Sequence, residues 1–142
     1  SGIVRDPADY QPYKIRPVSE VIESVYPLPL NAKPGEKWLY SNAGYYILAE
    51  AISKISGKDW DKFITERLFI PAGMTQTRTN SAADIIPNRV SGYHQTAEGI
   101  INAENWIAVR PSGGFSSTVQ DLAKWDSFLE NGSLLSQDDR RL

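Results

Sequence analysis

The sequence predicts a mainly helical fold with short strands and long loops. Apolar residues recur at three- and four-residue spacings in three segments: about 42–56, about 60–69, and between Thr118 and Asn131. Nine prolines and ten glycines break up much of the remaining chain into turns and loops. With 142 residues and no internal repeat, the chain is long enough for one domain.

Composition and charge exclude several classes of protein. The net charge is -2 and the charges are interspersed, so the basic surface of a nucleic-acid-binding protein is missing. No apolar run reaches the length of a membrane-spanning helix. Cysteine is absent, and the single histidine, His94, is interpreted as a surface or loop residue. We therefore expect no nucleic-acid partner, no membrane span, no metal and no cofactor.

The first 17 residues are expected to form an irregular arm, because prolines interrupt them. Ser19 is expected to cap a short helix with Val21, Ile22 and Val25 on its apolar face. Pro27 ends this helix, since proline cannot continue it.

The strongest helix is predicted over about 42–56. Its apolar residues are Ile47, Ala51, Ile52 and Ile55. Gly57 follows, where a left-handed helix cap belongs. Asp59 is then expected to cap a second helix over about 60–69, which Pro71 ends.

Residues 74–112 carry no clear helical pattern. Short strands are expected at 90–93 and 100–101. A stretch of this length without regular structure is uncommon, and its aromatic side chains favour order. Trp106 and Phe115 are expected to have a core or packing role rather than to line a pocket.

The last helix is predicted from a capping box, Thr118 with Asp121 three residues later. Its expected buried face comprises Leu122, Trp125, Phe128 and Leu129. Asn131-Gly132 ends it. The polar residues 137–142 are typical of the first turns of a further helix, and no helix-ending signal follows them. We therefore interpret the chain as cut from a longer polypeptide.

The candidate site residues are Tyr40 and Asn42, two positions apart at the entry to the strongest helix. In an extended segment, side chains at positions i and i+2 point the same way, so both could face one cleft. A phenol transfers protons once a neighbouring cation lowers its pKa from about 10, and a carboxamide hydrogen-bonds a substrate amide. The spacing alone favours a simpler alternative, in which Asn42 caps the helix and Tyr40 packs.

Tyr40-Ser41-Asn42 resembles the Tyr-x-Asn motif of the serine β-lactamase and penicillin-binding-protein superfamily. The chain is most similar to its group of class C β-lactamases, family VIII esterases and D-aminopeptidase-like enzymes. Further segments resemble that group in the same order: Ser1-Gly2-Ile3, Leu68 to Met74 (with Ala72 where leucine is usual), Gly92-Tyr93, and Pro111 to Ala123. Tyr-x-Asn alone is a weak signal, but these elements in this order are a strong one.

The resemblance implies a serine hydrolase whose site combines three motifs. A Ser-x-x-Lys supplies the acylated serine and a lysine, Tyr-x-Asn follows, and a Lys-Thr-Gly-like triad comes last. By position, the resemblance makes Tyr40 the proton-transfer group and Asn42 the residue that holds the substrate amide or the lysine. It also implies a β-lactam, D-amino peptide or ester substrate and a periplasmic or secreted location.

The first and third motifs are missing from this chain. No lysine has a serine three residues upstream, and no lysine or histidine is followed by serine or threonine and then glycine. The chain therefore contains no candidate nucleophile, and we expect residues 1–142 to be a partial domain that is inactive alone. It would be the helical lobe of the β-lactamase-like α/β fold, without the α/β sheet half.

Two alternatives to a fragment of an enzyme stay open at this point. One is a natural non-catalytic binding or interaction module derived from the same fold, and the other is an unrelated small helical domain. A truncated lobe is also expected to self-associate through the apolar surface where the sheet would dock.

Overall fold

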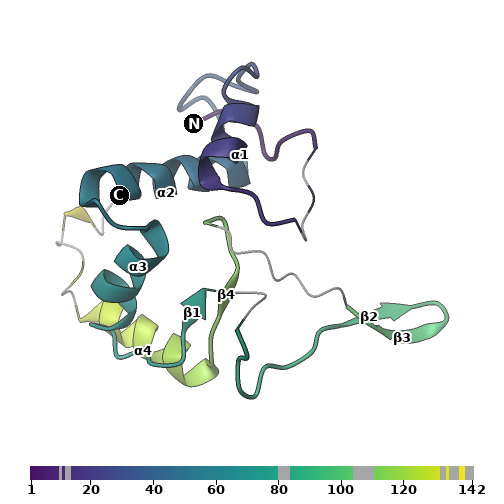
Figure 1. Cartoon of the computed structure of the whole chain (residues 1–142), viewed down its shortest axis with the longest axis vertical. Helices are drawn as coiled ribbons and strands as arrows, with labels where there is room; N and C mark the ends of the chain where they lie inside the picture. Colours follow the sequence, from purple (N-terminus) through teal and green to yellow (C-terminus); the bar gives the residue numbers. More distant parts are fainter. Residues whose placement is uncertain are drawn as a thin grey trace.

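The computed structural model describes residues 1–9, 11, 14–79, 84–103, 111–131, 134, 138 and 139. The described elements are, in chain order, α1 (Val18–Val25), α2 (Asn42–Ser56), α3 (Trp60–Ile64), the π-helical turn η1 (Thr65–Phe69), β1 (Arg78–Thr79), β2 (Tyr93–Thr96), β3 (Gly99–Asn102), β4 (Phe115–Ser116) and α4 (Val119–Glu130). The predicted fold class, mainly helical with short strands and long loops, is confirmed (Figure 1). No helix in the described part of the chain is long and apolar enough to cross a bilayer.

Helix α1 begins at Val18, two residues earlier than a helix capped by Ser19 would. Pro17 occupies the cap position with φ of -53°, and no side chain caps the helix there, so the prediction that Ser19 caps it is wrong. The proline ring holds φ near the helical value, which lets the helix start directly after it. Val21 and Val25 are buried as predicted, and α1 packs against α2.

Helix α2 has the predicted limits but a different cap. Ser41 Oγ accepts a hydrogen bond from the Gly44 N–H at 3.0 Å, so the cap is Ser41 and the alternative in which Asn42 caps the helix is wrong. At the other end Gly57 adopts the left-handed conformation with φ of 69°, as predicted.

The buried face of α2 differs from the predicted one, because none of the four predicted residues is fully buried. Ala43, Tyr46 and Ala49 are buried, whereas Ile55, expected in the core, is 88% exposed. The buried positions are spaced by three and share one side of the helix. Both α1 and α3 pack against α2, so the neighbouring helices decide which residues are covered.

The helix predicted over 60–69 is present as α3 followed by η1. Asp59 lies at the cap position, but its side chain makes no capping hydrogen bond and instead accepts one from Lys62 Nζ at 2.7 Å. The last turn widens, because the Ile70 N–H donates to the Thr65 carbonyl five residues back.

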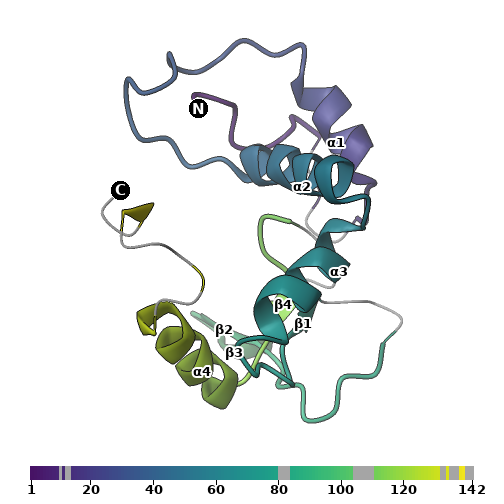
Figure 2. The ribbon, with the colours of Figure 1, turned by 90° about the vertical axis from the view of Figure 1, so that its left-hand side faces the viewer.

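An aromatic cluster joins this helix to the small sheet formed by β1 and β4. The two strands are antiparallel and pair Thr79 with Phe115. The Phe115 ring meets Trp60 and Phe69 edge-on, with centroids 6.2 Å and 5.6 Å away. Figure 2 shows α3 beside β1 and β4. The Phe115 ring packs against these two rings, although its side chain is 38% exposed, and Trp106 lies outside the described residues.

Strands β2 and β3 form an antiparallel hairpin that extends away from the helices (Figure 1). The strand predicted at 100–101 is confirmed within β3. The strand predicted at 90–93 is displaced, since β2 begins at Tyr93 and Val90 is exposed outside any strand. His94 is exposed on β2, as expected of a surface histidine.

Helix α4 begins after Thr118, whose Oγ1 accepts a hydrogen bond from the Asp121 N–H at 3.2 Å. The other half of the predicted capping box is wrong, because the Asp121 carboxylate is buried against the segment around Thr77. Leu122, expected in the buried face, is 55% exposed. The helix ends before Asn131, as predicted, and the further helix predicted at 137–142 lies almost entirely outside the described residues.

Candidate functional site

Tyr40 lies in the extended segment that enters α2. Its side chain is 52% exposed. Its ring lies 6.3 Å from the Trp38 ring, and the Arg5 guanidinium carbon is 5.6 Å from the Tyr40 ring centroid. The Tyr40 phenol is thus accessible, and a cation lies over its ring.

Tyr40 borders an apolar groove of about 470 Å³. Its apolar walls include Ile3, Trp38, Leu39, Tyr45 and Leu48. A groove of this kind fits the apolar part of a small molecule.

Asn42 is the first residue of α2, and its side chain is directed to the N-terminal arm. Its Nδ2 donates a hydrogen bond to Asp6 Oδ1 at 2.7 Å. Its backbone N–H donates to the Arg5 carbonyl at 2.9 Å. The structure thus places Tyr40 on the groove and Asn42 against Asp6, two positions apart at one helix entry.

The N-terminal arm is held in place by close backbone contacts. The Asn31 N–H donates to the Gly2 carbonyl at 2.8 Å, and Ser41 Oγ donates to the Val4 carbonyl at 2.8 Å. Gly2 has φ of +74°, and a Cβ there would lie 1.9 Å from the Ala32 carbonyl oxygen, so only glycine fits. Sequence reasoning interpreted this arm as irregular and missed its contacts with the helix entry.

Tyr46 is a second phenol close to Asp6, but it is buried. Burial raises its pKa, the Asp6 charge raises it further, and the Arg16 charge lowers it by less. Because the Tyr46 side chain is buried and Tyr40 is accessible, Tyr40 is the better candidate for proton transfer.

Asp121 is the one charged residue among the described residues that is fully buried. Its Oδ2 accepts hydrogen bonds from the Gln76 N–H at 2.7 Å and from Thr77 Oγ1 at 2.9 Å. Lys124 Nζ donates to its Oδ1 at 2.9 Å and to the Gly73 carbonyl at 2.8 Å. These bonds tie α4 to the segment after η1, which indicates a structural role.

The stability of the fold is expected to depend on pH through Asp121. Burial alone raises the pKa of its carboxyl, but the hydrogen bonds from Lys124, Gln76 and Thr77 and the Lys124 charge outweigh it, so the pKa is lowered. The unfolded chain therefore binds a proton at Asp121 more readily than the folded protein does. The ionised carboxylate stabilises the fold fully above the pKa of Asp in the unfolded chain, about 3.9, and this contribution is lost as the pH falls through the lower pKa of the folded protein.

The test is the urea concentration at the unfolding midpoint, measured between pH 2 and 7. This midpoint should decline at acid pH, and the decline should be smaller in Asp121→Asn. The matched control is Asp126→Asn on the exposed side of α4, and an equal decline in all three proteins would contradict the assignment.

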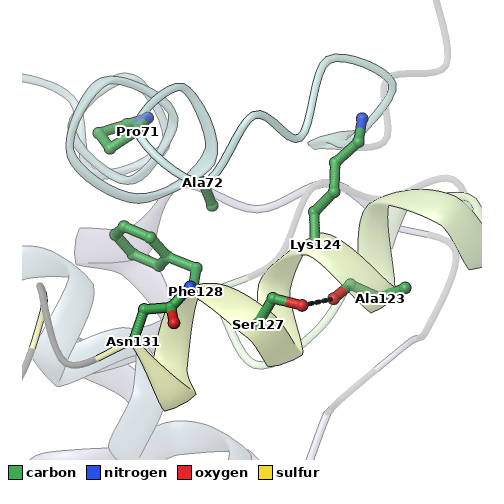
Figure 3. A pocket seen from close by; sticks show the side chains of 7 residues that line it. All are labelled: Pro71, Ala72, Ala123, Lys124, Ser127, Phe128 and Asn131. Carbon is green, nitrogen blue, oxygen red and sulfur yellow. Dashed lines mark hydrogen bonds between the residues drawn. The ribbon is translucent and has the colours of Figure 1, made fainter.

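A second hollow of about 430 Å³ lies between the turn at Pro71 and α4 (Figure 3). Lys124 and Ser127 line it, but Lys124 Nζ donates to Gly73, and Ser127 Oγ donates to the Ala123 carbonyl at 3.1 Å. Its described lining contains no carboxylate and no histidine, so it lacks an acid–base pair. Across the described residues, no three acidic or histidine side chains gather as metal ligands would.

Comparison with known proteins gives a consistent result for the whole chain. The family model described as Beta-lactamase matches residues 1–142. Penicillin-binding protein 4* of Bacillus subtilis (strain 168) is 26% identical over 147 residues, which cover 92% of this chain and 32% of that protein. A D-aminopeptidase of Brucella anthropi is 28% identical over 99 residues, 69% of this chain and 19% of that protein. The chain thus spans a third or less of the length of these relatives.

Solved structures share the arrangement of these elements. The D-amino acid amidase from Ochrobactrum anthropi SV3, complexed with D-phenylalanine, superposes with a TM-score of 0.82 at 22% identity, covering 98% of this chain and 44% of that one. The penicillin binding protein from Bacillus halodurans superposes with a TM-score of 0.82 at 21% identity, covering 99% of this chain and 46% of that one. At this identity the likeness shows a common fold.

Proposed function

Since this chain belongs to the beta-lactamase family, we propose that it supplies the Tyr-x-Asn part of a serine-hydrolase active site. Tyr40 would be the proton-transfer group, and Asn42 would hold the substrate amide or the lysine of the site. The observation that carries the proposal is the half-exposed Tyr40 phenol, which borders an apolar groove and has the Arg5 guanidinium beside its ring.

The role assigned to Tyr40 follows from the weak nucleophilicity of a serine hydroxyl. A serine hydroxyl is a weak nucleophile until a neighbouring base removes its proton. A phenolate held beside a lysine ammonium can take that proton, and the phenol that results can later return one to the leaving group. The serine and the lysine would come from a Ser-x-x-Lys segment outside residues 1–142, so we propose that these residues alone do not catalyse the reaction.

The substrate class we propose is a small amide or ester, namely a D-amino acid amide or peptide, a β-lactam or a short ester. Two of the relatives are named for D-amino acid substrates. The apolar wall formed by Trp38, Leu39 and Leu48 suits an apolar side chain on the acyl part of such a substrate. We also propose a periplasmic or secreted location, which cell fractionation tests.

The proposed function is tested by comparing two polypeptides. One is residues 1–142, and the other contains them together with a Ser-x-x-Lys segment. With D-phenylalanine amide, a chromogenic β-lactam and a p-nitrophenyl ester as probes, the longer polypeptide should hydrolyse at least one and form an acyl-serine that mass spectrometry detects. Residues 1–142 should do neither. Failure of the longer polypeptide to hydrolyse or become acylated would instead favour the non-catalytic binding module.

We propose that residues 1–142 by themselves self-associate through exposed apolar side chains. Tyr26, Trp38 and Ile55 are each more than 80% exposed, at 87%, 83% and 88%. Burying such groups against a second copy is favourable because it removes apolar surface from water. Sedimentation velocity should show association that weakens in Ile55→Lys. A monomer at high protein concentration would contradict this proposal.

A further inference from the structure

We propose that Asp6 is a positioning residue for Asn42. The arm at residues 4–6 then belongs to the site, because it sets the orientation of the Asn42 side chain. This inference rests on the proposed function of Tyr40 and Asn42. The carboxylate of Asp6 accepts the 2.7 Å hydrogen bond from Asn42 Nδ2 across 36 positions of the chain. The Asp6 side chain is only 21% exposed, so water competes little for this bond.

The chemistry of the pair decides which way the Asn42 carboxamide is turned. An amide has a donor end and an acceptor end, whereas a carboxylate only accepts hydrogen bonds. Asp6 therefore pairs with the nitrogen end of Asn42 and leaves the oxygen on the other side of the amide. That oxygen accepts hydrogen bonds, so it suits an ammonium group or a substrate N–H. By this pairing, Asp6 selects the kind of group that Asn42 can bind.

The arm holds the backbone of the motif as well as the side chain. The Arg5 carbonyl accepts hydrogen bonds from the Asn42 and Ala43 N–H groups, at 2.9 Å and 3.1 Å. These N–H groups belong to the first turn of α2, where a helix offers them no internal partner. Ser41 Oγ also donates to the Val4 carbonyl. Residues 4–6 of the arm therefore all contact residues 41–43 at the helix entry.

Arg5 connects the same pair to Tyr40. Its Nε lies 3.2 Å from Asp6 Oδ2, and its guanidinium carbon lies 5.6 Å from the Tyr40 ring centroid. One dipeptide therefore contacts both residues of the motif. The Arg5 side chain is 72% exposed, so solvent screens its charge, and we assign the positioning role to Asp6.

The kinetic test uses the longer polypeptide that carries the proposed activity, with D-phenylalanine amide as the probe. Asp6→Ala should lower kcat by about 10- to 100-fold with a smaller change in KM, because the amide loses its orientation. Asp6→Asn keeps an acceptor oxygen and should fall between wild type and Asp6→Ala. The control is Asp9→Asn, since Asp9 lies on the same arm but pairs with Arg16 at 3.0 Å. A kcat for Asp6→Ala within twofold of wild type would overturn the inference.

A spectroscopic test on residues 1–142 separates this inference from the proposed function. The Asn42 side-chain NH2 signals in a ¹⁵N–¹H spectrum should shift in Asp6→Ala and Asp6→Asn but stay in place in Asp9→Asn. Unchanged Asn42 signals would overturn the positioning role even if the longer polypeptide is an active hydrolase. Shifted signals together with an inactive longer polypeptide would support the positioning contact while the proposed function fails. If Asp6→Ala does not fold, the nearly isosteric Asp6→Asn carries the test.

Discussion

Tyr40→Phe is expected to lower kcat of the longer, hydrolytic polypeptide by about 10²- to 10⁴-fold, the usual contribution of a positioned proton-transfer group. The substitution removes only the phenol oxygen. The ring contacts with Trp38 and Arg5 can persist, since both partners lie against the ring. KM should therefore change less than kcat, and the unfolding midpoint should stay close to wild type. Steady-state kinetics with D-phenylalanine amide measures both constants.

The matched control for this substitution is Tyr26→Phe. Tyr26 is 87% exposed at the end of α1, so it loses the same hydroxyl outside the proposed site. Its kinetics should equal those of wild type. If Tyr40→Phe retained more than half of the wild-type kcat, Tyr40 would not be the proton-transfer group, and the role would have to fall to another residue of the longer polypeptide.

Trp60→Ala is expected to destabilise the fold by about 3–5 kcal/mol, the usual cost of truncating a buried aromatic side chain. Trp60 is 8% exposed and meets the Phe115 ring edge-on, so its loss leaves a cavity beside Phe115, which also contacts Phe69. The free energy of unfolding of a single domain is only about 5–15 kcal/mol, so the expected loss is a large share of it. Urea unfolding followed by far-ultraviolet circular dichroism avoids relying on tryptophan fluorescence.

Trp38→Ala provides the comparison for the stability measurement. Trp38 is 83% exposed, and substitutions at such positions usually change stability by about 0.5 kcal/mol or less. A cost below about 1 kcal/mol for Trp60→Ala, or equal costs for both variants, would show that the aromatic cluster around Phe115 does not hold α3 against β4.

The proposed site was only partly readable from the sequence. Tyr40 and Asn42 stand out because the motif is local and precedes a strong helix, and the resemblance to a known family gives them roles. Asp6 carries no comparable signal, since an arm interrupted by prolines has no periodicity that reveals its partner. Its bond to Asn42 spans 36 positions, and only the folded chain shows it.

The sequence by itself determined where the helices form. A local signal marks the carboxyl end of α2, where Gly57 supplies the left-handed residue that a helix end requires, whereas the cap oxygen at its start comes from Ser41 and not from Asn42. Tertiary structure decided which side chains are covered, because burial depends on neighbours that are distant in sequence. Ile55 and Leu122 fit helical periodicity yet lie exposed, while Asp121 is buried because Gln76 and Thr77, 45 and 44 positions away, satisfy its carboxylate.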